Sequence, residues 1–266
     1  MSRAKLAGRV GSTLALSPKM ILFISRQRTW NGSSAEEASA RPTGATYPGV
    51  HVETFAVGPL GCNCSILADL DAKRAIVVDP GGSYERIQSR LQALGVAVDA
   101  IVHTHTHFDH VGCTAELQRA TGSAASIHEA DRPLYDMLPV QAELFGMRTP
   151  VAADVDGGLV DGRVIRAGAL ELGILHTPGH TPGSCCFVAR DMHTTHLFAG
   201  DTLFRGSVGR TDLWGGDSST ILRSIRSKLL TLEDDTHVVT GHGVATTIGD
   251  ERARNPFLQA GVRITS

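Results

Sequence analysis

Short apolar runs separated by glycine-containing turns recur along most of the chain, and they predict a strand-rich domain. The runs are dominated by Val, Ile, Leu, Ala and Phe, and they end where Gly, Pro or Asp takes over. The segments that predict strands are residues 51–57, 64–68, 75–78, 98–102, 170–175, 185–188, 196–198 and 237–239.

Other segments have the apolar spacing of helices, namely residues 84–94, 111–120 and 218–232. In the last of them, Ile221, Ile225 and Leu229 recur every fourth residue, and Asp217 precedes the segment as a candidate N-cap. Residues 130–166 contain several Pro and Gly residues, and we expect an irregular insertion there that covers a cleft. Strands interspersed with helices indicate an α/β or α+β layered domain.

Composition limits the possible partners. The chain has 266 residues, of which 42% are hydrophobic and 20% charged, enough to bury one large core. No uninterrupted apolar stretch reaches the length of a membrane span, so no membrane partner is predicted. The net charge of −2 gives no general attraction for nucleic acid. A small molecule is the expected partner, and the sequence leaves the oligomeric state open.

The basic residues are concentrated at the N-terminus. Residues 1–49 hold seven Lys or Arg and two acids, and residues 50–266 hold 18 basic and 25 acidic residues. The first segment resembles an organellar transit peptide, and the alternatives are a disordered extension or an upstream start with Met20 as a later one. We therefore predict an extension over residues 1–48 and a folded domain over residues 49–266.

The cysteines favour a reducing compartment. There are five, an odd number, and their spacing does not resemble a disulfide framework. Cys185 and Cys186 are adjacent in a predicted strand, so their side chains should point to opposite faces and cannot pair well. The predicted location is the cytoplasm, with mitochondrial-type import as the alternative if the basic N-terminal segment is a targeting peptide.

A cluster of metal-ligand residues follows the predicted strand 98–102, with the spacing His-x-His-x-Asp-His. His105 and His107 are two residues apart on an extended segment, so they point the same way and can bind one ion. Asp109 and His110 begin the next turn, from which they can reach a second ion. Imidazole and carboxylate together suit Zn²⁺, Fe or Mn.

Three later strands end in the same manner, each running into a small-residue turn that presents a histidine or an aspartate. The residues presented are His180, Asp201 and His242. Each of these histidines alone would more often be structural. Ligands at strand ends converge readily in space, and together with residues 105–110 they make a set of six or seven donors.

The patterns of several other enzyme classes are missing. The sequence has no Gly-x-Ser-x-Gly elbow of a serine hydrolase, no phosphate-binding P-loop and no Gly-x-Gly-x-x-Gly dinucleotide motif. With these classes excluded, the metal-ligand pattern predicts a hydrolytic site with two metal ions.

The chain resembles the metallo-β-lactamase superfamily over roughly residues 50–258. The segments that carry the resemblance are residues 104–110, 177–184, 198–204 and 241–243. Residues 203–212 and 247–258 make it most similar to the short, glyoxalase II-like hydrolases of the hydroxyacylglutathione hydrolase type. The resemblance implies a single-domain, four-layered αββα sandwich with its site at one edge of the two sheets.

The resemblance also implies two divalent metal ions, with Zn²⁺ expected and Fe or Mn open. The implied ligands are His105, His107 and His180 for one ion, Asp109, His110 and His242 for the other, and Asp201 bridging them. A hydroxide shared by the ions would attack a substrate carbonyl, because metal binding lowers the pKa of water from about 15.7 towards 7. Asp109 is the catalytic residue predicted to orient it.

The expected substrate is a glutathione-derived thioester, hydroxyacylglutathione. Long-form glyoxalase II proteins bind glutathione largely through an additional C-terminal domain, and only 24 residues follow His242, so those contacts do not carry over. Arg210 is a candidate anchor for a substrate carboxylate, and the alternative is that it pairs with Asp212. Two other activities stay open, a mononuclear iron persulfide dioxygenase and a hydrolase of β-lactams or other esters.

Overall fold

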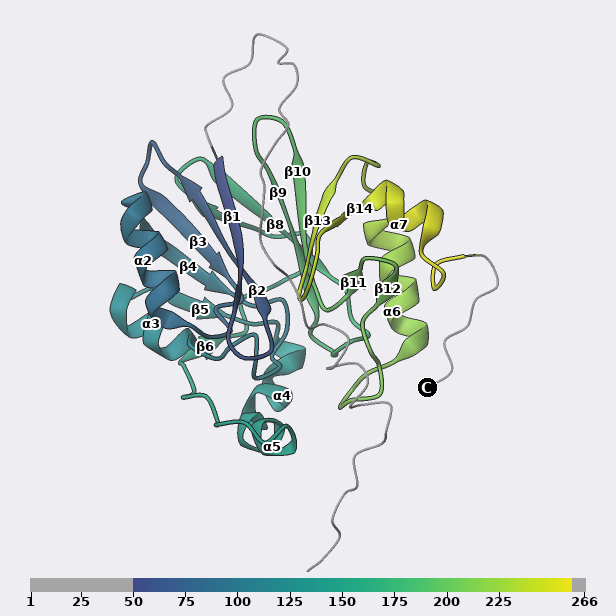
Figure 1. Cartoon of the computed structure of the whole chain (residues 1–266), viewed down its shortest axis with the longest axis horizontal. Coiled ribbons are helices and arrows are strands. Elements are labelled where there is room, and N and C mark those ends of the chain that lie inside the picture. Colours follow the sequence, from purple (N-terminus) through teal and green to yellow (C-terminus); the bar gives the residue numbers. More distant parts are fainter. Residues whose placement is uncertain (1–49, 260–266) are drawn as a thin grey trace, which may run out of the picture. The chain divides into compact units, whose positions relative to one another are not determined.

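The computed structural model describes residues 50–259, which form two six-stranded sheets lying face to face (Figure 1). The strands of the first sheet are, in spatial order, β1 (Val50–Val57), β2 (Cys62–Asp69), β3 (Arg74–Val78), β4 (Ala97–Val102), β5 (Ala124–Ser126) and β6 (Val155–Asp156). Those of the second are β14 (Thr246–Thr247), β13 (His237–Thr240), β10 (Thr195–Gly200), β9 (Cys185–Arg190), β8 (Leu170–His176) and β7 (Val164–Ala167). A small hairpin follows β10, formed by β11 (Leu203–Phe204) and β12 (Ser207–Val208).

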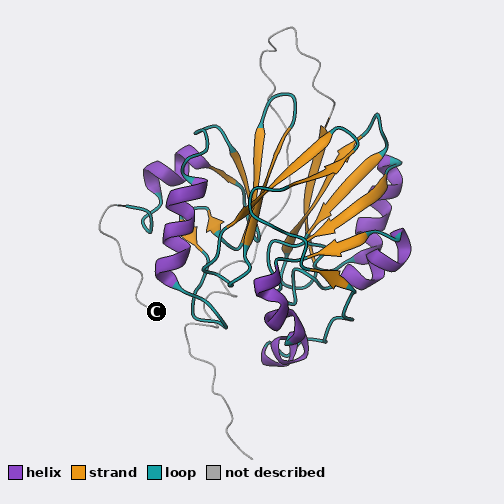
Figure 2. Cartoon of the chain, turned by 180° about the vertical axis from the view of Figure 1, so that it is seen from behind, coloured by secondary structure: helices purple, strands orange, loops and turns teal. Residues whose placement is uncertain are grey.

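Helices cover the outer face of each sheet, as the view from behind also shows (Figure 2). Helices α2 (Tyr84–Leu94) and α3 (Thr114–Thr121) pack on the first sheet. Helices α6 (Ser218–Ser224) and α7 (Ile248–Arg254) pack on the second. The order helix, sheet, sheet, helix confirms the predicted four-layered αββα sandwich.

Apolar layers lie on both faces of each sheet, so neighbouring residues of one strand enter different layers. Leu67 packs between the sheets, whereas Ile66 packs beneath α2 and α3. Cys185 and Cys186 divide in the same way between the middle layer and the layer under α6, which confirms their predicted orientations. All five cysteines are buried and free. Strands buried on both faces have continuous apolar sequences, which is why they were predictable.

Parallel pairing brings several strand ends to one edge. Strands β3 to β6 run parallel to one another in the first sheet, and β10 runs parallel to β13 in the second. Strand β8 is antiparallel to β9, which is antiparallel to β10, so β8 and β10 also run the same way. The turns that follow β4, β8, β10 and β13 carry the predicted ligands.

Helix α3 begins at Thr114, later than the predicted start at residue 111. The backbone N–H of Cys113 donates to the carbonyl of Pro80 at 2.9 Å, and a Cβ on Gly112 would collide with the carbonyl of Gly81. The residues after the histidine motif are therefore held against the turn that follows β3, and they are not available for the first turn of the helix.

The predicted helix over 218–232 ends early. After α6 the chain continues as a π-helical segment, Ile225–Leu229, closed by a hydrogen bond of 2.9 Å from the N–H of Leu230 to the carbonyl of Ile225. Asp217 caps the first turn of α6 with its side chain, as predicted.

The prediction of an irregular insertion over residues 130–166 was wrong for much of its length. This region contains two short helices, α4 (Arg132–Asp136) and α5 (Leu138–Leu144), besides β6 and β7. Pro133 and Pro139 lie in the first turns of these helices. Proline is tolerated there because the backbone N–H groups of the first turn have no partner within the helix.

Residues 1–49 and 260–266 lie outside the described part of the chain. The predicted extension over residues 1–48 and its role in targeting therefore stay predictions. Within residues 50–259, no helix is both long enough and apolar enough to cross a membrane.

Candidate metal centre

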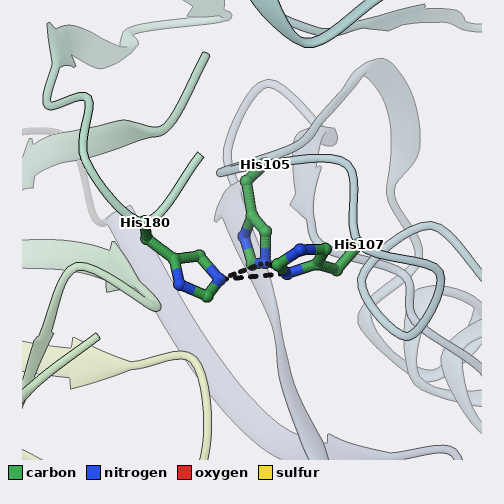
Figure 3. A group of neighbouring side chains, drawn as sticks. All are labelled: His105, His107 and His180. Atoms are coloured by element: carbon green, nitrogen blue, oxygen red, sulfur yellow. Dashed lines mark hydrogen bonds between the residues drawn. The ribbon is translucent and has the colours of Figure 1, made fainter. Parts of the chain in front are cut away.

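Three imidazoles from two loops point at one spot (Figure 3). His105 and His107 follow β4, and His180 follows β8. Nε2 of His105 lies 3.0 Å from Nδ1 of His107 and 3.2 Å from Nε2 of His180. Nδ1 of His107 and Nε2 of His180 are 3.0 Å apart. All three side chains are buried.

The protein fixes which nitrogen carries the proton in two of these rings. Nδ1–H of His180 donates to the carbonyl of Arg210 at 2.8 Å. Nδ1 of His105 lies 3.1 Å from the hydroxyl of Thr104, whose own hydrogen goes to the Asp79 carboxylate at 2.6 Å. Nε2 of both rings therefore presents a lone pair. Burial lowers the pKa of all three imidazoles, which keeps them neutral at pH 7.

A second group of donors contains Asp109, His110 and His242. Nε2 of His242 is 3.2 Å from Nε2 of His110 and 3.3 Å from Oδ2 of Asp109. On the far side of each ring, Nδ1 of His110 donates to Asp79 at 3.0 Å, and Nδ1 of His242 donates to the carbonyl of Leu60 at 3.1 Å. The inner nitrogens of this group are therefore the ones that can bind a cation. Burial alone lowers the pKa of both imidazoles, but nearby carboxylates, Asp109 for both rings and Asp201 for His242, raise it above the usual value, so a bound cation would take the place of their protons.

Asp201 lies between the two groups. Its Oδ2 is 3.7 Å from Nε2 of His180, in the first group. Its Oδ1 is 3.5 Å from Nε2 of His110 and 3.7 Å from Nε2 of His242, in the second. Oδ1 is buried and has no hydrogen-bond donor among the described residues. One carboxylate is thus placed to serve both groups.

The donor set fits divalent cations. In each group two Nε2 atoms face each other across 3.2 Å, and a positive charge between them stabilises this arrangement. Two nitrogens bound to one Zn²⁺ at about 2.0–2.1 Å, with roughly 90–110° between the bonds, stand about 2.8–3.4 Å apart. The observed separations fall in this range. All seven predicted ligands are therefore brought together in an arrangement that fits two ions.

Comparison with known proteins agrees with this geometry. The model of the metallo-β-lactamase superfamily matches residues 57–242. The chain belongs to the metallo-β-lactamase superfamily. It is 38% identical over 218 residues to the hydroxyacylglutathione hydrolase GloC of Haemophilus influenzae, covering 79% of this chain and 99% of that protein.

Solved structures give the same superfamily. The B3 metallo-β-lactamase BLEG-1 is 35% identical with a TM-score of 0.72, and the match covers 79% of this chain and all of that one. TTHA1623, solved in a di-iron-bound form, is 34% identical with a TM-score of 0.65, covering 77% of this chain and all of that one. Superfamily membership thus establishes the fold and leaves the substrate and the metal open.

One residue that holds this metallo-β-lactamase centre together was missed from the sequence. The carboxylate of Asp79 accepts hydrogen bonds from the N–H and O–H of Thr104, at 2.7 and 2.6 Å, as well as from His110. It thereby orients His110 directly and His105 through Thr104. The signal was present, because Asp79 directly follows the apolar run 75–78 in the way the candidate ligands follow theirs.

Asp131 was missed as well, and it ties the two loops of the first donor group together. Its carboxylate accepts from the N–H of Thr106 at 3.1 Å, the hydroxyl of Thr181 at 2.9 Å and the N–H of Gly183 at 2.6 Å. It lies within residues 130–166 at a position with no motif of its own, so no local pattern indicates this role.

The candidate substrate anchor Arg210 and two further histidines lie around the donors. The guanidinium of Arg210 donates to both carboxylate oxygens of Asp212, at 2.7 and 2.8 Å, which is the paired alternative; its role as a substrate anchor stays a prediction. His103 lies outside the donor groups and hydrogen-bonds Thr114. His176 donates to the carbonyl of Pro182 at 2.9 Å and so supports the turn that carries His180.

Proposed function

We propose that this chain is a dinuclear metal-dependent thioester hydrolase, and that its substrate is a hydroxyacylglutathione. The observation that carries the proposal is the pair of donor groups with Asp201 between them, because a single ion would need only one group. The similarity to GloC across nearly the whole of that protein supports the choice of substrate class. The histidine-rich set favours Zn²⁺, with Fe or Mn as alternatives.

The chain's own residues prepare the reaction. When bound, two divalent cations supply Lewis acidity and lower the pKa of water to about 7. Burial alone raises the pKa of the Asp109 carboxyl, but His110 and His242 lower it to below its usual range, so the carboxylate stays ionised. It can therefore accept a hydrogen bond from the attacking water and orient it.

The site needs no nucleophile from the protein and little acid catalysis. The leaving group of a thioester is a thiolate, which departs without prior protonation. Cys62 lies 3.5 Å from Nδ1 of His110, but burial raises the pKa of its thiol to about 12, so it stays protonated. The donor groups and Asp109 therefore fit hydrolysis by a water that the site orients, with no nucleophile from the protein.

Substrate recognition is proposed to use Arg210. Glutathione carries two carboxylates, and a guanidinium binds a carboxylate through two parallel hydrogen bonds. Arg210 makes this kind of contact with Asp212, beside the turn that carries His180. A substrate carboxylate would replace Asp212 as the partner.

A β-lactam hydrolase is the second candidate. The similarity to the B3 metallo-β-lactamase BLEG-1, at 35% identity, favours it. The glyoxalase II-like segment at residues 203–212 favours a thioester instead. A mononuclear iron persulfide dioxygenase would need only part of the donor set, and the close approach of His242 to His110 favours a second ion.

Metal analysis combined with three assays tests these functions. Protein purified without added metal is analysed for Zn, Fe and Mn, and assayed with S-lactoylglutathione, glutathione persulfide and a cephalosporin. We expect two ions per chain and a kcat/KM for S-lactoylglutathione at least about 100-fold above the others, a difference of roughly 2.7 kcal/mol. One iron per chain with oxygen uptake on the persulfide, or preferred turnover of the cephalosporin, would contradict the proposal.

Two histidine variants provide the control. His242→Ala should lose the second ion and most of the activity, whereas His193→Ala should retain both, because His193 is exposed and lies outside the donor groups.

A further inference from the structure

A buried glutamine outside the donor set holds the backbone on both sides of His107. Gln141 lies in α5 and only 1% of it is exposed. Its Oε1 accepts from the N–H of Phe108 at 3.0 Å, and its Nε2 donates to the carbonyl of Thr106 at 3.2 Å. The side-chain amide thus pairs with the residues immediately before and after His107, much as a neighbouring strand would.

The same amide ties this loop to the insertion. Nε2 of Gln141 also donates to the carbonyl of Leu134, in α4, at 2.7 Å. The amide therefore has both its oxygen and its nitrogen satisfied, and it links α4 and α5 to the ligand loop. A buried polar group left without a partner destabilises the fold, so the amide and the loop backbone hold each other in place.

His107 differs from the other four imidazoles of the centre in how it is oriented. Each of the others has Nδ1 hydrogen-bonded to a protein group outside the donor set, namely Thr104, Asp79, Arg210 or Leu60. The outward nitrogen of His107 is Nε2, which is buried and has no hydrogen-bond partner within residues 50–259. Its ring therefore depends on the backbone for its position.

We propose that Gln141 is a positioning residue for His107. By fixing the peptide groups on both sides of His107, its amide sets where Nδ1 of His107 lies relative to His105 and His180. The inference rests on the proposed ligand role of His107. Groups that hydrogen-bond the side chain of a metal ligand typically change metal affinity by 10- to 100-fold when they are removed, and we expect the lower end of this range for a residue that fixes the backbone of a ligand.

The test is Gln141→Met, which keeps the length of the side chain and removes its hydrogen bonds. Zn²⁺ affinity of metal-free protein is measured by chelator competition in two backgrounds. His242→Ala isolates the first donor group, and His107→Ala isolates the second. We expect Gln141→Met to lower Zn²⁺ affinity at least about tenfold in the His242→Ala background and less than about twofold in the other.

Gln118→Met is the matched control. The amide of Gln118 makes the same paired contact with a backbone, donating to the carbonyl of Asp154 at 2.8 Å and accepting from its N–H at 3.0 Å, but Asp154 is not next to a ligand. This variant should leave Zn²⁺ affinity unchanged in both backgrounds. Gln141→Glu, which keeps the acceptor for Phe108 and loses both donations, is measured in parallel and should give an intermediate loss, whether or not Gln141→Met folds.

Two results would overturn the inference: an unchanged affinity in the His242→Ala background, or an equal loss in both backgrounds. If His107→Ala alone leaves the number and affinity of bound Zn²⁺ ions unchanged, the ligand role of His107 fails instead. The two failures are therefore distinguishable.

Discussion

The outward nitrogen of His107 makes no hydrogen bond within the described residues, so the replacement of His107 should affect the metal more than the fold. His107→Ala removes one of three nitrogens that lie within 3.2 Å of one another. We expect activity on S-lactoylglutathione to fall by at least about 100-fold, as when a group stabilising the transition state is lost. The circular dichroism spectrum should be retained. Full activity in a metal-replete variant would show that His107 is not a ligand.

Asp201 should couple the two ions. Asp201→Asn preserves the shape of the side chain but removes the negative charge that both donor groups share. We expect the metal content to fall towards one ion per chain and most turnover to be lost, as measured by elemental analysis and a steady-state assay. If two ions stay tightly bound at an unchanged rate, Asp201 is only structural.

The candidate ligands could be recognised from sequence, and the residues that support them largely could not. His180 and His242 each stand in a small-residue turn after an apolar run, so a local pattern marks them. Asp131 and Gln141 bind backbone groups of loops that are distant in sequence, and only the folded chain brings these together. Asp79 is an intermediate case. Its position after the apolar run 75–78 is visible in the sequence, but its hydrogen bonds to Thr104 and His110 are not.

At the scale of elements, the longer buried strands were predictable and the shortest strands were not. Strands such as β5, β11, β12 and β14 have two or three residues, too few for a pattern to emerge. Helix α7 was also missed, although Thr247 caps it by accepting from the N–H of Asp250 at 3.2 Å. The prolines of α4 and α5 led to the prediction of an irregular segment, because proline prevents a helix at interior positions. In the first turn, where these prolines lie, proline is compatible with a helix.

The cap of α6 can be tested directly. Asp217 accepts a hydrogen bond of 2.6 Å from the N–H of Thr220, and its own N–H donates to the carbonyl of Gly179, next to His180. Asp217→Ala should lower the free energy of unfolding by about 1 kcal/mol, measured by urea denaturation. Asp235→Ala, at an exposed aspartate near the start of β13, should change it by less than about 0.5 kcal/mol. Equal effects of the two variants would argue against the cap.

At the scale of the whole molecule, the site depends on both sheets at once. The loop carrying His105 follows a strand of the first sheet, and the turns carrying Asp201 and His242 follow strands of the second. Asn63, in the first sheet, donates to the carbonyls of Thr240 and Gly243, at 2.8 and 3.0 Å, on either side of His242. Each donor group takes members from both sheets, so the apolar layer between the sheets sets the distances within each group.

The seven candidate donors all lie between residues 105 and 242, so the chain before Gly49 should be dispensable for catalysis. GloC supports this, because 99% of it matches only 79% of this chain. We expect a chain that begins at Gly49 to bind two metal ions and to retain its kcat/KM for S-lactoylglutathione within about twofold, since chain ends contribute to stability only where they are tied down. The measurements are metal content, soluble yield and steady-state kinetics beside the full-length protein. A loss of metal, solubility or rate by more than a few-fold would place residues 1–48 within the functional fold and move the predicted domain boundary.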